Sequence, residues 1–285
     1  MSQISSLLIR ISFIEFPYDV TASSCHHLSL KDFPILSLEN IDFRVNSCGT
    51  VVSLPRLINV FNFNITASDL DMPSVNACFN AMLLRLMDNP CLSMVSICFG
   101  KPIEDCVQLE GMNLTRMLSV LPKLRSLVID GHFLKFLCAD QVPKWLPSAL
   151  NSLRYFRLYD LRHSDLDQLQ GALCLLRNSP NLETLRLSHT KLEAMHYDVG
   201  PASDHLESPD CLDQTLNQLR TVEITNLKGS RPELLFIKLL LAHSPSLDKM
   251  TIQSSGTFDA SKRLNIGMEL MQFPRASPKA EIIYS

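Results

Sequence analysis

The fold is decided by residues 124–130, LRSLVID, which follow a proline at the end of an apolar helical pattern. Leu127 and Ile129 alternate with their neighbours, and this period of two is typical of a strand with one buried face. Pro122 stands two residues before Leu124, and proline cannot continue a helix and disfavours one in the residue before it. The stretch therefore predicts a helix, a sharp stop and a short strand.

The same pattern recurs along the chain at a spacing of roughly thirty residues, a period typical of strand–helix repeats. Each unit has an apolar anchor and further apolar residues three and five positions later. The anchors are Leu92, Leu124, Leu153, Leu182, Leu219 and Leu247. Four of these six anchors have a proline two residues earlier, namely Pro90, Pro122, Pro180 and Pro245. The reuse of one junction indicates repeated modules.

Apolar residues at helical spacing precede several of these junctions. The predicted helices cover residues 79–87, 114–121, 166–176 and 234–242. A module of one strand and one helix cannot bury its apolar face alone, whereas stacked modules can. We therefore predict an α/β fold, an irregular leucine-rich-repeat solenoid with a parallel β-sheet on one side and helices on the other. A doubly wound sheet shares the alternation but gives no reason to repeat the junction.

The prediction divides the chain into two parts. Residues 1–210 form the repeat-like region, of which 1–75 are less regular because their short alternating stretches have little helical pattern between them. Residues 211–285 form a distinct C-terminal segment that continues the solenoid.

Composition limits the function. The chain of 285 residues has 46% hydrophobic and 19% charged residues, a balance that excludes a disordered protein. Its formal charge of −3 argues against nucleic-acid binding, and its longest apolar run is too short to cross a membrane. Nine cysteines without a CxxC pair favour a reducing compartment. We therefore expect a cytoplasmic or nuclear protein, or one found in both.

Catalytic motifs are missing from the sequence: no nucleophile elbow, phosphate-binding loop or zinc-protease motif occurs. Cys25-His26-His27 comes nearest to a metal site, but adjacent strand residues point to opposite faces. Asp165 and Asp167 are better explained as a helix N-cap and its first turn. We predict no catalytic residue, metal or cofactor, and an enzyme on a doubly wound sheet is the least favoured alternative.

Exposed positions on the predicted strands are better functional candidates. If the strands pair in register, one group of large side chains comes together: Tyr155, Arg157, Tyr159, Arg186 and Glu223. Tyr and Arg are enriched in protein-binding hot spots, and the concave faces of solenoids commonly bind proteins. The alternative is a plain surface ion pair between Glu223 and Arg157 or Arg186.

The C-terminal segment contains a more specific pattern, with LRTVEI at 219–224, SPSLDKM at 244–250 and FPRASPKAEIIY at 273–284. Together with Gly229 and the apolar helix that follows it, this pattern resembles the FBD domain of plant F-box/leucine-rich-repeat proteins. Residues 153–160 (LRYFRLYD) and 167–182 resemble the repeat region of the same family. The resemblance covers roughly residues 115–285.

The resemblance implies the substrate-recognition part of a Skp–cullin–F-box ubiquitin ligase receptor, in which repeats hold a target protein and an F-box docks on the Skp adaptor. No helical block typical of an F-box precedes the repeats in this sequence. We therefore expect a fragment, a truncated product or an F-box-less form, with Skp bound only by a longer form. The alternative is a stand-alone repeat protein that acts as a scaffold or as a competitor for the target, whose identity the sequence does not reveal.

Overall fold

The computed structural model describes part of the chain. The described residues are 7–13, 17–22, 38–45, 62–67, 92–98, 114–119, 121–138, 142–147, 149–189, 200–255 and 260–285. The chain divides into two compact units, residues 1–140 and 141–285. The predicted helix at 79–87 and the Cys25-His26-His27 group lie outside the described residues.

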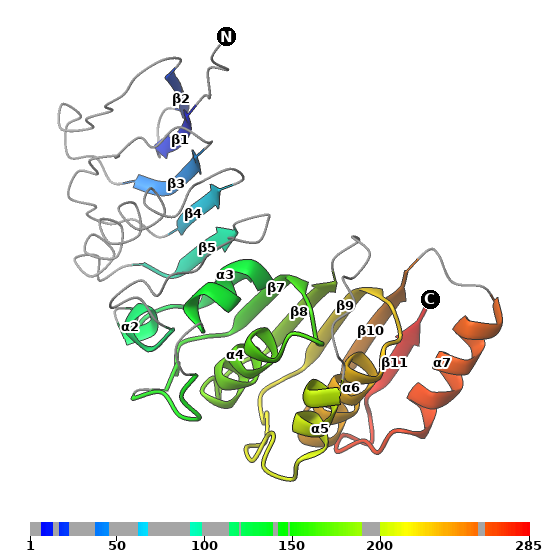
Figure 1. Ribbon diagram of the computed structural model, residues 1–285. Helices are drawn as coiled ribbons and strands as arrows, with labels where there is room; N and C mark the ends of the chain where they lie inside the picture. The colour runs from blue at the N-terminus through cyan, green and yellow to red at the C-terminus, as the bar shows by residue number, and fades with distance from the viewer. Residues whose placement is uncertain are drawn as a thin grey trace. The chain divides into compact units, whose positions relative to one another are not determined.

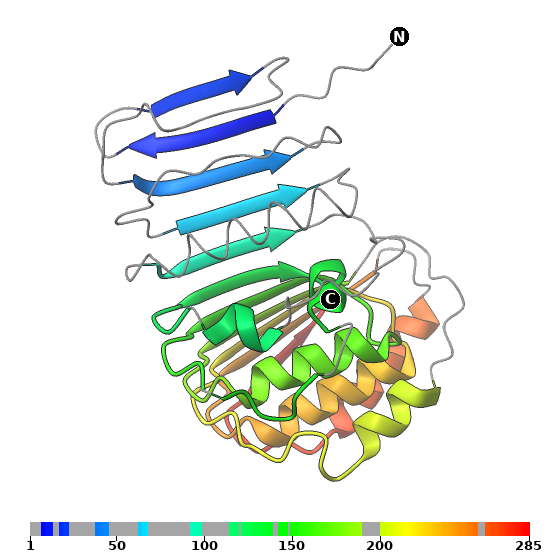
Figure 2. The same ribbon diagram turned by 60° about the vertical axis from the view of Figure 1, so that its left-hand side comes forward.

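The first unit is a mixed sheet with two described helices (Figure 2). Its strands are β1 (Leu7–Phe13), β2 (Pro17–Ala22), β3 (Leu38–Val45), β4 (Asn62–Ala67), β5 (Met94–Cys98) and β6 (Ser126–Asp130). Strands β3, β4, β5 and β6 pair in parallel in chain order, which is the predicted arrangement. The described helices are α2 (Leu114–Ser119) and α3 (Gly131–Leu137).

The prediction of a wholly parallel sheet is wrong at the N-terminal edge. Strand β1 lies between β2 and β3 and is antiparallel to both. Only three residues separate Phe13 from Pro17, whereas a parallel connection needs a dozen or more. The short link therefore requires a hairpin. Pro17 begins the edge strand β2, one of the few strand positions that tolerate proline.

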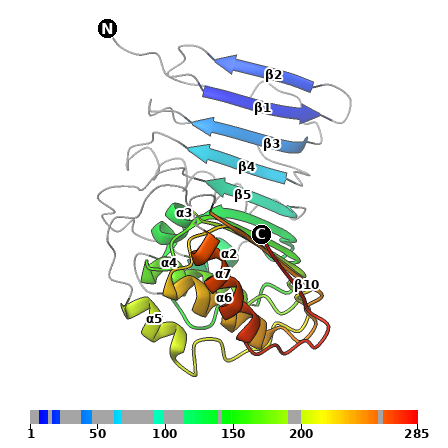
Figure 3. The same ribbon diagram turned by 90° about the vertical axis from the view of Figure 1, so that its right-hand side faces the viewer.

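The second unit is a parallel sheet whose strands follow chain order. Its strands are β7 (Tyr155–Leu161), β8 (Thr184–His189), β9 (Thr221–Leu227), β10 (Lys249–Ser254) and β11 (Glu281–Tyr284). Its helices are α4 (Leu166–Arg177), α5 (Gly200–Glu207), α6 (Arg231–His243) and α7 (Ala260–Gln272). The helices lie on one side of the sheet and leave the other side open (Figures 1 and 3). Residues 211–285 thus continue the sheet begun by β7 and β8.

One hydrogen-bonded turn recurs where the helical side of a module meets its strand. The anchor N–H donates to the carbonyl three residues earlier, for example from Leu182 to Ser179 at 3.1 Å and from Leu247 to Ser244 at 3.2 Å. The six predicted anchors are at most 2% exposed. The same turn links Ala280 to Ser277 and starts β11. The sequence pattern missed this last module because Ala280 stands where the others have leucine.

Helix boundaries follow local capping chemistry. Asp165 is the N-cap of α4 and accepts a hydrogen bond from the Gln168 N–H at 3.3 Å, so its predicted structural role is confirmed. A capping box joins Ser230 and Glu233 at the start of α6. Gly229, just before it, has φ +67°, and a Cβ there would clash with Ile266 of α7. Helices α3, α5 and α7 were not predicted. Of the described helices, α6 and α7 are the longest at 13 residues, and none is long and apolar enough to span a bilayer.

Two polar residues at the C-terminal end of α4 hold the connection that leads into β7. The Asn178 side chain accepts from the Leu146 N–H at 3.0 Å and donates to the Cys174 carbonyl at 2.8 Å. The neighbouring Arg177 donates to the carbonyls of Lys144 and Cys211. Both Arg177 and Asn178 are buried, so their hydrogen bonds replace those that water would make.

The Asn178→Ala substitution should lower the free energy of unfolding by about 1–3 kcal/mol, because it leaves the Leu146 N–H buried without an acceptor. Chemical denaturation of the purified chain measures this change. The control is Asn181→Ala, which removes a partly exposed side chain that donates to the Asn151 carbonyl, and which should cost less than about 0.5 kcal/mol. Equal effects of the two substitutions would contradict the role of Asn178.

Candidate functional site

On the open face of the second unit, every second residue of each strand presents its side chain. In β7, Phe156 and Leu158 are buried under the helices, whereas Tyr155, Arg157 and Tyr159 are half-buried on the other face. The burial patterns of β8 and β9 alternate in the same way. Polar side chains on this face are therefore presented on backbone that the buried leucines hold in place.

The pairing register brings four of the five predicted residues together. Tyr155 pairs with Thr184, and Arg157 pairs with Arg186. Arg186 pairs in turn with Glu223 on β9. The strands of this unit therefore pair in the register that the sequence analysis assumed, and this places Tyr155, Arg157, Arg186 and Glu223 over three adjacent strands. We call these residues, with Tyr159, the strand-face cluster.

Contacts within the strand-face cluster join neighbouring strands. The Arg186 guanidinium lies 5.6 Å from the centre of the Tyr155 ring, a cation–π distance. Its Nη2 donates to Glu223 Oε1 at 3.0 Å, and its Nε lies 2.8 Å from Oε2. Burial works to lower the pKa of Arg186, but Tyr155 and Glu223 together raise it, so the guanidinium stays charged.

Arg157 is placed differently from Arg186. Its guanidinium lies 4.3 Å from the centre of the Tyr159 ring on its own strand, and it forms no ion pair with any described carboxylate. Of the two ion pairs considered from the sequence, the one with Arg186 is formed. Arg157 and Arg186 face each other across strands, and like charges in that position repel. The cluster therefore keeps unneutralised positive charge at Arg157.

The in-register pairing of β7 with β8 ends before Tyr159. Register shifts occur beyond Leu158 in β7 and beyond Ile252 in β10, so Tyr159 does not pair with Ser188. Asp160 and Asn226 have φ angles of 49° and 59°, a left-handed conformation in which Asn and Asp are more common than most residues. These positions bend the strand ends and turn the following residues toward the helices.

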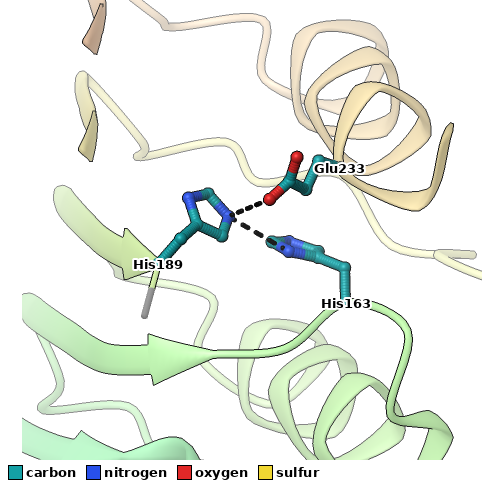
Figure 4. A group of neighbouring side chains, drawn as sticks. All are labelled: His163, His189 and Glu233. Atoms are coloured by element: carbon teal, nitrogen blue, oxygen red, sulfur yellow. Dashed lines mark hydrogen bonds and ion pairs between the residues drawn. The ribbon is translucent and has the colours of Figure 1, made fainter. Parts of the chain in front are cut away.

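The structure also brings together three buried residues that the sequence did not single out: His163, His189 and Glu233 (Figure 4). The His189 Nε2 atom lies 3.1 Å from His163 Nδ1 and 3.7 Å from Glu233 Oε1. Their sequence separations match no metal-binding motif, so a local pattern could not have found them. Among the described residues they form the group that could hold a metal ion.

Burial sets the protonation of the two histidines. It holds the pKa of His163 well below its usual value, and the neighbouring His189 adds to this lowering. It also lowers the pKa of His189, against the opposing effects of the Glu233 carboxylate and the Thr225 carbonyl. Both imidazoles are therefore neutral at physiological pH.

Comparison with known proteins shows which family this chain is related to. The FBD family model matches residues 206–252. An F-box/FBD/LRR-repeat protein of Arabidopsis thaliana is 32% identical over 190 residues, which are 67% of this chain and 45% of that protein. This chain is a relative of the plant F-box/FBD/leucine-rich-repeat proteins.

Two further relatives agree with this family. A probable FBD-associated F-box protein of Arabidopsis thaliana is 30% identical over 42% of this chain and 28% of its own length. A second F-box/FBD/LRR-repeat protein of that plant is 28% identical over 61% of this chain and 36% of its own length. The chain thus spans less than half the length of the curated relatives that it matches. No solved structure is significantly similar.

The predicted FBD-like segment is confirmed over the matched range. That range runs from the end of α5 through β9 and α6 into β10. The stretch at 273–284, which also suggested the family, lies beyond it and ends in β11, the last strand of the sheet. The predicted domain boundary at residue 211 stays a prediction.

The coupling between Arg186 and Glu223 should be below about 1 kcal/mol, because their side chains are 39% and 37% exposed and water screens the pair. A double-mutant cycle with Arg186→Ala and Glu223→Ala, read by chemical denaturation, measures it. The Arg154–Glu183 pair, at 3.5 Å and more exposed, provides the control cycle and should give a value nearer zero. A coupling above about 2 kcal/mol would show that the ion pair stabilises the fold, and would contradict the view that the two side chains are available to a binding partner.

Proposed function

We propose that this chain is a non-catalytic protein-binding module, and that it serves as the target-recognition part of an F-box-type ubiquitin ligase receptor. The observation that carries the proposal is the strand-face cluster on the open side of a parallel sheet. The F-box/FBD/LRR names of its relatives support an interaction role in that family. The role of a stand-alone scaffold or competitor is the second candidate.

The architecture supports this proposal over an enzyme on a doubly wound sheet. In the second unit the helices lie on one face of the sheet (Figure 3), whereas a doubly wound sheet carries them on both. The strand-end position where such enzymes bind substrate is occupied here by His163, His189 and Glu233, which are 4%, 3% and 5% exposed. A substrate cannot reach side chains that are this deeply buried. We propose an irregular leucine-rich-repeat solenoid as the complete fold.

The chemistry of the strand-face cluster indicates the kind of target. Tyr155 and Tyr159 present aromatic rings, which provide large contact areas at low entropic cost. Arg157 offers a guanidinium without a carboxylate partner among the described residues. The matching surface on a target would be an acidic side chain next to an apolar group. A protein in the cytoplasm or nucleus is the proposed target, since that is where Skp–cullin ligases act.

A triple variant tests the strand-face cluster. Tyr155→Ala/Arg157→Ala/Arg186→Ala should lose the proteins that the wild-type chain retains from plant extract, because a hot-spot side chain contributes about 2 kcal/mol, or roughly 30-fold in Kd. Quantitative mass spectrometry of the retained proteins gives the comparison, and titration of each purified protein gives its Kd.

The matched control removes three cations from the helical side: Lys238→Ala/Lys262→Ala/Arg263→Ala, on α6 and α7. It should retain the same proteins as the wild type. Circular dichroism establishes that both variants are folded. If both variants retain the proteins equally, the open sheet face is not the binding surface.

The Skp adaptor should bind only a longer form of the protein. In size-exclusion chromatography with a purified Skp adaptor, residues 1–285 should elute separately, and a fusion that carries an F-box at its N-terminus should co-elute. In the proposed division of roles the repeats hold the target and the F-box makes the adaptor contact. Co-elution of residues 1–285 alone would contradict this division of roles.

A further inference from the structure

The group formed by His163, His189 and Glu233 takes its side chains from three consecutive modules. His163 stands between β7 and α4, His189 ends β8, and Glu233 lies in the first turn of α6 after β9. In Figure 4 the His189 ring points toward both other side chains, and the two dashed lines join it to His163 and to Glu233. All candidate ligand atoms of the group lie within 4.8 Å of one another.

We propose that His163, His189 and Glu233 bind a divalent transition-metal ion, with Zn²⁺ as the expected ion, and that this ion links the three modules. Two histidines and one glutamate are a known zinc ligand set. The ion is expected to have a structural role, because the side chains are too buried for a substrate to reach.

The spacing of the ligand atoms fits one ion. With metal–ligand bonds of about 2.0–2.1 Å, neighbouring ligands of a tetrahedral zinc ion lie about 3.4 Å apart. The His189 Nε2 atom is 3.1 Å from His163 Nδ1 and 3.7 Å from Glu233 Oε1. These two distances fall on either side of the expected value. The remaining pair, between His163 and Glu233, lies within 4.8 Å, so these two side chains must move toward each other for the site to close around zinc. A water molecule would complete the tetrahedron.

Outer hydrogen bonds orient two of the three ligands. The His189 Nδ1 atom lies 3.1 Å from the Thr225 carbonyl oxygen, which can only accept, so Nδ1 carries the proton and Nε2 presents a lone pair. Glu233 Oε2 accepts from the N–H groups of Ser230 at 2.8 Å and Lys228 at 3.2 Å. The other carboxylate oxygen, Oε1, therefore faces the histidines. Metal-binding histidines and carboxylates are commonly held by such partners.

The protons available to His163, His189 and Glu233 are too few to pair all their acceptor atoms, which favours a bound cation. With Nδ1 of His189 donating to Thr225, its Nε2 can accept from His163 Nδ1–H. The Nε2 atom of His163 then has an unshared pair, is buried and makes no hydrogen bond to a described residue. Glu233 Oε1 faces the Nε2 of His189, so two acceptors meet without a proton between them. A divalent ion bound by His163 Nδ1, His189 Nε2 and this oxygen would place positive charge between the facing acceptors, and the proton of His163 would then sit on its Nε2 atom.

The proposed ion would stabilise the stacking of modules. It would join segments that lie 26 and 44 residues apart, and binding to the folded state alone raises stability by linkage. His189 is already linked to β9, because the Asn226 side chain donates to its carbonyl at 3.3 Å. The metal would extend this link to β7 and to α6.

Zinc titration of the full chain tests the proposal. After treatment with a chelator, addition of Zn²⁺ should raise the Tm of the wild type, and elemental analysis should find one ion that is lost in both His163→Gln and Glu233→Gln. Loss of one ligand should weaken zinc binding more than about 10-fold, by comparison with the loss of outer-shell partners. Glutamine at position 233 can keep the capping box of α6, so this variant should fold if His163→Gln does not.

The control is His243→Gln, since His243 lies at the end of α6 and its Nδ1 atom lies 2.9 Å from the Leu239 carbonyl oxygen. It should bind zinc as the wild type does. Cobalt distinguishes this site from the cysteines: Co²⁺ should give the visible bands of a tetrahedral ion without thiolate charge-transfer absorption. Thiolate bands, an unchanged Tm of the wild type with zinc, or undiminished binding by Glu233→Gln would each overturn the proposal.

Discussion

A single carbonyl group in each module fixes where the next module lies. The Arg154 carbonyl accepts from the N–H groups of both Glu183 and Thr184, and the Glu183 carbonyl does the same for Arg220 and Thr221. The Arg220 carbonyl then serves Asp248 and Lys249. Each acceptor stands immediately before the first residue of a strand, so the register of the whole strand follows from it. The buried anchors and the turn before them hold these donors in place.

This constraint gives the two faces of the second unit different structural requirements. One face must bury leucine, valine and isoleucine under the helices, and a one-residue slip would expose all of them. The other face is free to vary, since its side chains point away from the core. The strand-face cluster uses that freedom, and its contacts run between strands because the register sets Arg186 beside Glu223 and Tyr155 within reach. The side chains of the strand-face cluster therefore stand on backbone that the pairing of the sheet holds in place.

This arrangement explains how the segment matched by the FBD family model is held in the sheet. Residues 206–252 cover a little more than one module, and their strands pair with β8 on one side and β11 on the other. The segment is therefore part of the same sheet and buries its apolar face against its neighbours. Glu233, within the match, caps α6 and also faces His189 of the preceding module. A family segment defined by sequence thus depends on contacts from outside its own boundaries.

The sequence predicted those features of the structure that depend on residues close together along the chain. Strands from β5 to β10 and helices α2, α4 and α6 were predictable, because alternating or helical spacing of apolar residues reports burial locally. Helices α5 and α7 were missed, since each buries only two residues. Helix α3 was missed because it follows β6 without a connection.

The sequence by itself determined the repeat, the alternation of strand and helix, and the family, because patterns of residues close together along the chain reveal all three. Only the tertiary structure decided the direction of β1, the choice of Arg186 over Arg157 as the partner of Glu223, and the meeting of His163, His189 and Glu233. These depend on which strands become neighbours and in which register they pair. Residues tens of positions apart have no spacing rule, so only the folded backbone brings them together.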